Sequence, residues 1–219
     1  MSTRLAWQPD PDDPEEQAFL DLYGPWDPMS PTEVGSLLEG FPEPWWVAGG
    51  YAIEAFTGVR RFHEDVDLVM FNDAVPALRK HLDGTFHLWN AYERALRPLD
   101  DHFPGLMHPQ SQIWMRRDAG SPWRVDCILD VRDDQGRWVS KRDPDHVAPL
   151  EDVTWVADDG IRYVRPEIQL FFKAKQDRDK DRVDLDSAWP LLGSDQRAWL
   201  RGALARHLPD HPWRERLGA

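Results

Sequence analysis

The pattern of apolar and polar residues divides the chain into three parts. Residues 1–30 are rich in Pro, Asp and Glu, which predicts a loosely ordered acidic extension that lies at most along the surface. Residues 31–164 alternate short apolar runs, typical of strands, with a few helical segments. From Pro166 the apolar residues recur at helical spacing. We therefore expect a mixed domain over 31–164 and a small C-terminal helical subdomain over 165–219.

Residues 45–58 have the pattern of a strand, a glycine turn and a helix. An apolar run at 45–48 ends at Gly49 and Gly50, and residues 51–56 space their apolar groups as a helix does. The next segment, 64–71, is the strongest strand prediction because its apolar residues are largely β-branched or aromatic.

The remaining segments complete an α+β fold, a mixed β-sheet flanked by helices. Further strands are predicted at 86–90, 112–117 and 123–131, helices at 30–41, 73–82, 182–192 and 194–208, and a long loop around Pro98, Pro104 and Pro109.

Length, charge and cysteine content exclude several classes of protein. With 219 residues and 41% hydrophobic content, the chain can close one ordinary core, with at most a small helical appendage. The 39 acidic and 26 basic residues leave a net charge of −13, which disfavours a long nucleic-acid groove. The lone Cys127 excludes an internal disulfide, and neither a signal peptide nor a long apolar stretch is evident. We expect a soluble cytoplasmic protein that does not associate with a membrane.

Asp65 and Asp67 are the first candidates for chemistry. On a strand, side chains at positions i and i+2 project to the same face, so these two carboxylates converge. Such a pair is costly to hold together unless cations neutralise it, and hard oxygen ligands suit Mg²⁺ bridging triphosphate oxygens. An exposed acidic strand start is the alternative explanation. The glycine turn just upstream favours the ligand site, because backbone amides at a turn and a helix N-terminus bind phosphate.

A third carboxylate would complete a two-metal site, and Asp126 is the candidate. It lies within an apolar run that otherwise predicts a buried strand, where a charge needs a partner. Asp130 lies on the same face but at the strand end, where a solvated carboxylate is more common. We expect Asp126 to bind a metal and to accept a proton from an acceptor hydroxyl.

Basic residues near these acids are candidates for nucleotide contact. Lys173 follows two phenylalanines on the predicted helix and is expected to reach a triphosphate, whereas Lys180, beside an aspartate, is the weaker candidate. A solvated charged face is the alternative for both. His63 lies two residues before Asp65 and is expected to orient a metal-binding aspartate by donating a hydrogen bond to it, without binding the metal itself.

The order of these motifs along the chain resembles that of the polymerase-beta-type nucleotidyltransferase superfamily. The motifs are Gly49, Gly50, Arg61, His63, Asp65 and Asp67, followed by Asp126 and the segment 165–185. The likeness is to small aminoglycoside and lincosamide nucleotidyltransferases and their uncharacterised relatives, and it covers roughly a third of the chain.

The resemblance implies a triphosphate held by the glycine turn, two Mg²⁺ ions on the three aspartates, and nucleotide contact from Arg61, Lys173 and Lys180. It implies transfer of a nucleoside monophosphate, AMP from ATP, to a hydroxyl of a small acceptor of the aminoglycoside or lincosamide kind. In that family a serine often stands near the glycine turn, whereas here Tyr51 follows Gly50.

Two alternatives belong to other classes. A toxin-like nucleotidyltransferase acting on tRNA or protein needs a basic surface, and the one basic concentration near the predicted sheet comprises Arg116, Arg117, Arg124, Arg137, Lys141 and Arg142. A catalytically inactive relative would bind nucleotide or a partner without turnover. The sequence leaves the acceptor, the donor base and the oligomeric state open.

Overall fold

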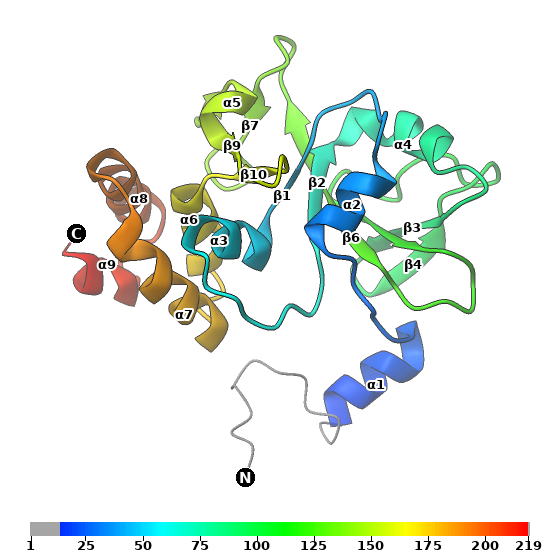
Figure 1. Ribbon diagram of the computed structural model, residues 1–219, viewed down its shortest axis with the longest axis horizontal. Helices are drawn as coiled ribbons and strands as arrows, with labels where there is room; N and C mark the ends of the chain where they lie inside the picture. The colour runs from blue at the N-terminus through cyan, green and yellow to red at the C-terminus, as the bar shows by residue number, and fades with distance from the viewer. Residues whose placement is uncertain (1–13, 219) are drawn as a thin grey trace.

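A mixed β-sheet forms the centre of the computed structural model, which describes residues 14–218, so residues 1–13 of the acidic extension lie outside the described part. The strand order is β4-β3-β5-β6-β2-β1-β10-β9, and β7 branches off β6 and pairs with β8 (Figure 1). The strands are β1 (Trp45–Val47), β2 (Asp67–Phe71), β3 (His87–Tyr92), β4 (Ala95–Pro98), β5 (Gln112–Arg116), β6 (Val125–Arg132), β7 (Trp138–Val139), β8 (Val147–Ala148), β9 (Thr154–Val156) and β10 (Arg162–Val164).

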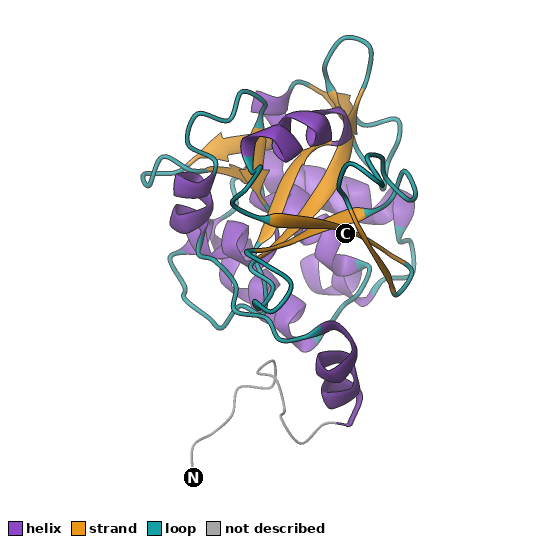
Figure 2. Cartoon of the chain, turned by 90° about the vertical axis from the view of Figure 1, so that its right-hand side faces the viewer, coloured by secondary structure: helices purple, strands orange, loops and turns teal. Residues whose placement is uncertain are grey.

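Helices surround this sheet, as Figure 2 shows. They are α1 (Pro14–Tyr23), α2 (Pro31–Leu37), α3 (Gly49–Thr57), α4 (Val75–His81), α5 (Leu150–Val153), α6 (Pro166–Ala174), α7 (Asp179–Ala188), α8 (Ser194–His207) and α9 (Pro212–Leu217), with 3₁₀ turns at Asn72–Ala74 and Trp189–Leu191. The expected α+β class, a mixed sheet flanked by helices, is confirmed.

The central strands follow the predicted pattern closely. β6 runs parallel to β2 and β10 runs parallel to β1, whereas the other strand pairs are antiparallel. The apolar run of β2 is buried on both faces because helices and the C-terminal segment cover the sheet. Ser30 caps α2 in a capping box with Glu33, and Gly58 ends α3 in the left-handed conformation.

Residues 14–30 of the acidic extension are more ordered than their composition predicts. Within it, residues 14–23 form α1, and Trp26 packs edge-on against Trp114 of β5. The indole of Trp123 donates a hydrogen bond to the carbonyl of Tyr23 at 2.6 Å. These aromatic contacts supply the apolar burial that a count of prolines and acidic residues cannot show.

The segment predicted as a long loop also contains a strand. β4 pairs with β3 through a hairpin whose turn residues Glu93 and Arg94 both have positive φ, 46° and 66°. Neither residue is a glycine, so the turn carries no sequence signal of the usual kind. The short elements α5 and β7 to β10 were likewise not predicted.

A second cluster of buried apolar side chains lies among the C-terminal helices. α6 begins at Pro166 as expected and packs against α3, α7 and α8. The cluster includes Phe171 and Leu204, and Ile53 of α3 joins it, so α3 packs against both the sheet and the C-terminal helices. In Figure 1 these helices lie at the end of the molecule opposite β3 and β4. Within residues 14–218, none of the helices combines the length and apolarity that crossing a bilayer demands.

Candidate active site

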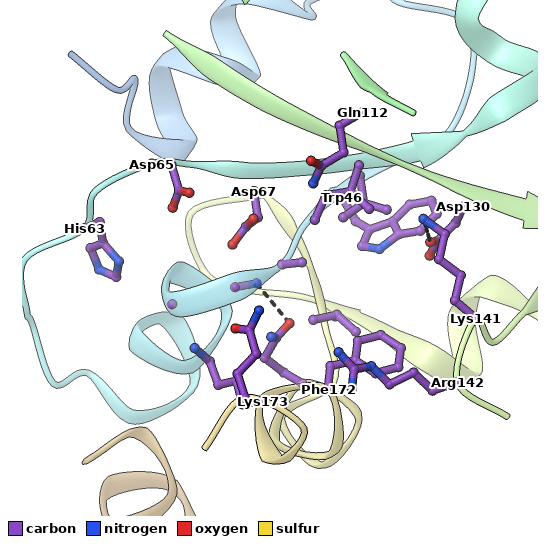
Figure 3. A pocket seen from close by; sticks show the side chains of 18 of the residues that line it. Trp46, His63, Asp65, Asp67, Gln112, Asp130, Lys141, Arg142, Phe172 and Lys173 are labelled. Carbon is purple, nitrogen blue, oxygen red and sulfur yellow. Dashed lines mark hydrogen bonds and ion pairs between the residues drawn. The ribbon is translucent and has the colours of Figure 1, made fainter. Parts of the chain in front are cut away.

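Three carboxylates meet where the parallel strands β2 and β6 begin. Asp67, the first residue of β2, is paired with Asp126 of β6, and Asp65 lies two residues ahead of β2. Each side chain offers an oxygen, and these oxygens all lie within 4.8 Å of one another. Figure 3 shows Asp65 and Asp67 pointing into a common cavity. The structure therefore brings together the three predicted ligands, although Asp65 precedes the strand.

The carboxylates raise one another's proton affinity. Burial raises the pKa of Asp126 well above its usual range, and the charges of Asp67 and Asp65 raise it further. Burial, followed by the charge of Asp65, likewise raises the pKa of Asp67. Three carboxylates so close together are compatible with full ionisation only when cations neutralise them.

Asp126 has an oxygen that the protein does not satisfy. Its Oδ1 is buried and makes no hydrogen bond to any described residue. The indole of Trp114, on the facing residue of β5, lowers the pKa of Asp126 slightly but forms no hydrogen bond of normal geometry with it. An unpartnered buried carboxylate oxygen is costly, and a divalent cation would satisfy it. Asp65, Asp67 and Asp126 thus fit hard cations such as Mg²⁺.

Gly49 is required where α3 begins. Its φ is 65°, and a Cβ at this position would lie 1.7 Å from Oδ2 of Asp67. The turn therefore packs directly against the acidic cluster, which any larger residue would displace. The amide of Gly49 donates to Oε1 of Gln169 at 2.9 Å, so this N–H is engaged within the protein. Gln169 was not predicted; its signal was a polar residue on the apolar face of a helix.

Gly50 makes room for Arg61. A Cβ on Gly50 would lie 2.0 Å from a terminal guanidinium nitrogen of Arg61. That guanidinium donates two hydrogen bonds to Asp184 of α7, at 2.9 and 3.1 Å. Arg61 therefore lines the cavity with its charge already paired.

The two predicted phosphate lysines are also paired. Lys173 is 5% exposed, and its ammonium lies 3.1 Å from Asp181 and 2.8 Å from Asp184. Lys180 pairs with Glu64 at 2.7 Å, and this glutamate is 44% exposed. Because the partner of Lys180 is solvated while the partners of Lys173 are buried, Lys180 can exchange its partner for a ligand at lower cost.

His63 takes a different partner from the one predicted. Its ring stacks on Tyr51, with centroids 3.7 Å apart, and its Nε2 lies 2.8 Å from Oε2 of Glu54. Burial lowers the pKa of His63. The expected hydrogen bond to Asp65 or Asp67 is replaced by this contact with Glu54, because the stacked ring directs Nε2 toward α3.

The cavity in front of the carboxylates has a volume of about 420 Å³. Trp46 lines it from β1, Trp138 from β7 and Phe172 from α6. Asp130, expected to be solvated, is 6% exposed; it accepts a hydrogen bond from the indole of Trp138 at 2.6 Å and pairs with Lys141 at 3.3 Å. The expectation for Asp130 was wrong because β7 folds back over the end of β6.

Comparisons with known proteins place this geometry in a known fold. No protein-family model and no curated protein matches the sequence. The lincosamide antibiotic adenylyltransferase LnuA, solved with lincomycin bound, is 17% identical, with 71% of this chain and 92% of LnuA covered at a TM-score of 0.49. The solution structure of the antibiotic-resistance factor ANT(2'')-Ia is 18% identical, with 81% and 94% covered and a TM-score of 0.49.

The crystal structure of ANT(2'')-Ia in complex with adenylyl-2''-tobramycin is 16% identical, covers 80% of this chain and 97% of ANT(2'')-Ia, and has a TM-score of 0.50. At such identity the likeness shows a shared fold. The chain therefore has the nucleotidyltransferase-type α+β fold that its motifs led us to expect.

Proposed function

We propose that the protein transfers a nucleoside monophosphate from a nucleoside triphosphate, with ATP as donor, to a hydroxyl of a small molecule. The observation that carries the proposal is the convergence of Asp65, Asp67 and Asp126, with an unsatisfied buried oxygen on Asp126. The cavity in front of them is large enough for small substrates and lies within the size range of ligand pockets, roughly 300–1,000 Å³.

In the proposed reaction the acceptor hydroxyl oxygen attacks the α-phosphorus, the bond from that phosphorus to the bridging oxygen of the β-phosphate breaks, and pyrophosphate leaves. Mg²⁺ ions, when bound, neutralise the phosphate charge. Asp65, Asp67 and Asp126 hold them, and Asp126 accepts the hydroxyl proton. No covalent enzyme intermediate is required, so positioning and charge neutralisation account for catalysis.

The basic residues of the cavity have different roles in binding the nucleotide. We assign Lys180 to direct phosphate contact, since its present partner Glu64 is readily released. Lys173 acts at a distance, because its positive charge lowers the pKa of Asp67 even though Lys173 is paired with Asp181 and Asp184. The sequence favoured Lys173 over Lys180 for phosphate contact, and the present assignment reverses that order. The reason is that the buried Asp181 and Asp184 hold Lys173 in place. Arg61 and the glycine turn shape the same end of the cavity.

An RNA acceptor is less compatible with the surface. Of the six basic residues that would bind it, Arg124 pairs with Asp27, and Arg116 lies over the rings of Trp89 and Trp123. Arg142 has no carboxylate partner among the described residues. Others pair locally, Arg137 with Asp133 and Lys141 with Asp130. These pairings reduce the charge available to a phosphate backbone.

The test is transfer from ATP labelled in the α-phosphate to a panel of small hydroxyl compounds, followed by mass spectrometry of the products. We expect an adduct heavier by one nucleoside monophosphate, together with released pyrophosphate. The matched controls are Asp67→Asn, which should abolish transfer, and Asp133→Asn, a surface carboxylate that should not affect it.

Metal-dependent ATP binding with no adduct on any acceptor would instead indicate the inactive nucleotide-binding relative. Tight, salt-sensitive RNA binding would support the toxin-like alternative, since phosphate contacts weaken steeply with added salt.

A further inference from the structure

The cavity has a second end, away from the acidic cluster, that the proposed reaction does not use. Figure 3 shows Asp130, Lys141, Arg142 and Phe172 grouped there, with Asp65 and Asp67 at the other side of the view. Asp126 and Asp130 lie on the same face of β6, four residues apart, which corresponds to about 13 Å at the rise of a β-strand. The two ends are therefore about the length of a small molecule apart.

Arg142 differs from the other cations that line the cavity. Each of the others has a carboxylate partner: Arg61 with Asp184, Lys141 with Asp130, Lys173 with Asp181, Arg178 with Asp181, and Lys180 with Glu64. Arg142 makes no ion pair or side-chain hydrogen bond with any described residue; its guanidinium lies over the ring of Phe172, 5.5 Å from the centroid.

The guanidinium of Arg142 is partly withdrawn from water without a carboxylate partner among the described residues. The residue is half-buried, and burial alone lowers the pKa of its guanidinium, with no carboxylate acting against that shift. Withdrawing a guanidinium from water without a counter-charge is costly, and the face of Phe172 compensates only in part. An anion entering the cavity would offset this cost through a charge-assisted hydrogen bond.

The loop that carries Arg142 is held in place. The hydroxyl of Ser140 accepts hydrogen bonds from the amides of Arg142 and Asp143, at 3.3 and 3.2 Å. Asp143 in turn lies 2.9 Å from Nε2 of His207 on α8. The guanidinium is thus presented to the cavity by a preorganised loop, which lowers the entropic cost of binding a ligand.

In the proposed reaction, an anion bound at this end would not come from the nucleotide. The phosphates would lie at the carboxylate end, where Asp65, Asp67 and Asp126 would hold the cations that neutralise them, and a nucleobase carries no full negative charge at neutral pH. β6 leads from Asp126, which we assign to the acceptor hydroxyl, to Asp130 and its partner Lys141.

We propose that Arg142 binds an anionic group of the acceptor, a carboxylate or a phosphate, at the end of the cavity away from the hydroxyl that is modified. This inference rests on the proposed function. It differs from the aminoglycoside or lincosamide acceptor that the sequence resemblance implies, because Lys141 already neutralises the buried Asp130 and leaves this end with one excess positive charge.

The first test is inorganic phosphate binding to protein already saturated with Mg²⁺ and a non-hydrolysable ATP analogue, so that the carboxylate end is filled. Binding is followed at constant ionic strength through the NMR signal of the Trp138 indole N–H, which donates to Asp130 beside Lys141. We expect a saturable shift in the wild type and in the control Arg60→Gln, a change at an exposed arginine. The dissociation constant should rise at least tenfold in Arg142→Gln.

A wild type without a saturable shift, or an Arg142→Gln variant with unchanged affinity, overturns the proposal. Failure of the ATP analogue to bind would instead contradict the proposed function, and the difference in phosphate affinity between the wild type and Arg142→Gln would still report on Arg142.

The second test compares transfer to glucose 6-phosphate, glucuronate, glucose and glucosamine. We expect the two anions to be preferred, and Arg142→Gln to raise their KM at least tenfold without changing the KM for ATP. A preference for glucosamine, or a rise in the KM for ATP instead, would assign Arg142 to another role.

Discussion

Asp67 and Asp126 face each other across β2 and β6, and because these strands run parallel, both side chains leave the sheet at the same edge and on the same face. The glycine turn before α3 packs against Asp67, with no room for a side chain. The acidic cluster therefore comes from two segments, residues 65–67 and β6, with the glycine turn packed against it, and its carboxylates repel one another unless cations are present.

Asp126→Asn should remove most transfer activity while leaving the metal-free fold at least as stable as the wild type. The amide keeps the volume of the carboxylate but neither accepts the hydroxyl proton nor binds metal with full charge. We expect a loss on the order of 10²-fold or more in single-turnover rate. In EDTA the melting temperature should stay equal or rise, since one of three repelling carboxylates is gone.

Asp130→Asn provides a contrasting variant on the same face of the same strand. It removes the partner of Lys141 but leaves the three carboxylates intact. We expect retained metal-dependent binding and a lower melting temperature. Equal loss of metal-dependent ATP binding in both variants would mean that the third ligand is assigned wrongly.

ATP binding should depend on a divalent cation. The three carboxylates otherwise repel the triphosphate, so we expect affinity measured by calorimetry to fall at least tenfold when Mg²⁺ is replaced by EDTA. Asp65→Asn and Asp67→Asn should each lower the ATP affinity measured with Mg²⁺ and leave the affinity measured in EDTA unchanged. Identical ATP affinity with and without metal would mean that the three carboxylates do not bind metal and that Asp65 and Asp67 are an ordinary acidic strand start.

Much of the site could be predicted from the sequence because its elements are local. The strand period pairs Asp65 with Asp67, an interrupted apolar run marks Asp126, and two glycines mark the turn. The partners of Lys173 could not be predicted in this way. Asp177, with a φ of 47°, ends the helical conformation between α6 and α7, so α7 turns back toward α6. Only this turn brings Asp181 and Asp184 of α7 to Lys173.

Nonlocal pairing also explains the other differences. Asp130 is buried because β7 folds over the end of β6, and Arg142 faces the cavity because Asp143 is tied to α8. Neither contact leaves a periodic pattern in the sequence. The described part of the acidic extension, residues 14–30, packs on the sheet through Trp26, whose partner Trp114 lies on β5.

Lys173→Ala should destabilise the protein strongly. Two buried carboxylates, on Asp181 and Asp184, would each lose one of two cationic partners, because Arg178 and Arg61 remain. We therefore expect a loss of about 1.5–3 kcal/mol in the free energy of unfolding. Lys175→Ala, at an exposed position on the same segment, should change the free energy of unfolding by no more than about 0.5 kcal/mol. Urea denaturation measures both. Adding Asp181→Asn to Lys173→Ala should restore part of the loss, because the other partner of Asp181, Arg178, is 47% exposed and can be solvated. A purely additive double variant would contradict the ion-pair explanation.

Gly49→Ala should abolish metal-dependent ATP binding as well as lower stability. The new Cβ would lie 1.7 Å from Oδ2 of Asp67, so the carboxylate must leave its position in the cluster. The positive φ of 65° adds a backbone cost of about 1–2 kcal/mol.

Gly160→Ala separates these two effects. Gly160 has a similar φ of 79°, but a Cβ there meets nothing within 4 Å. This variant should therefore show the backbone cost alone, about 1–2 kcal/mol in the free energy of unfolding, with Mg²⁺-dependent ATP affinity unchanged. If Gly49→Ala loses no more affinity than Gly160→Ala, then Asp67 can move without harm and its position beside the turn does not determine metal binding. If only Gly49→Ala loses affinity, the close packing of the turn against Asp67 is what positions the carboxylate.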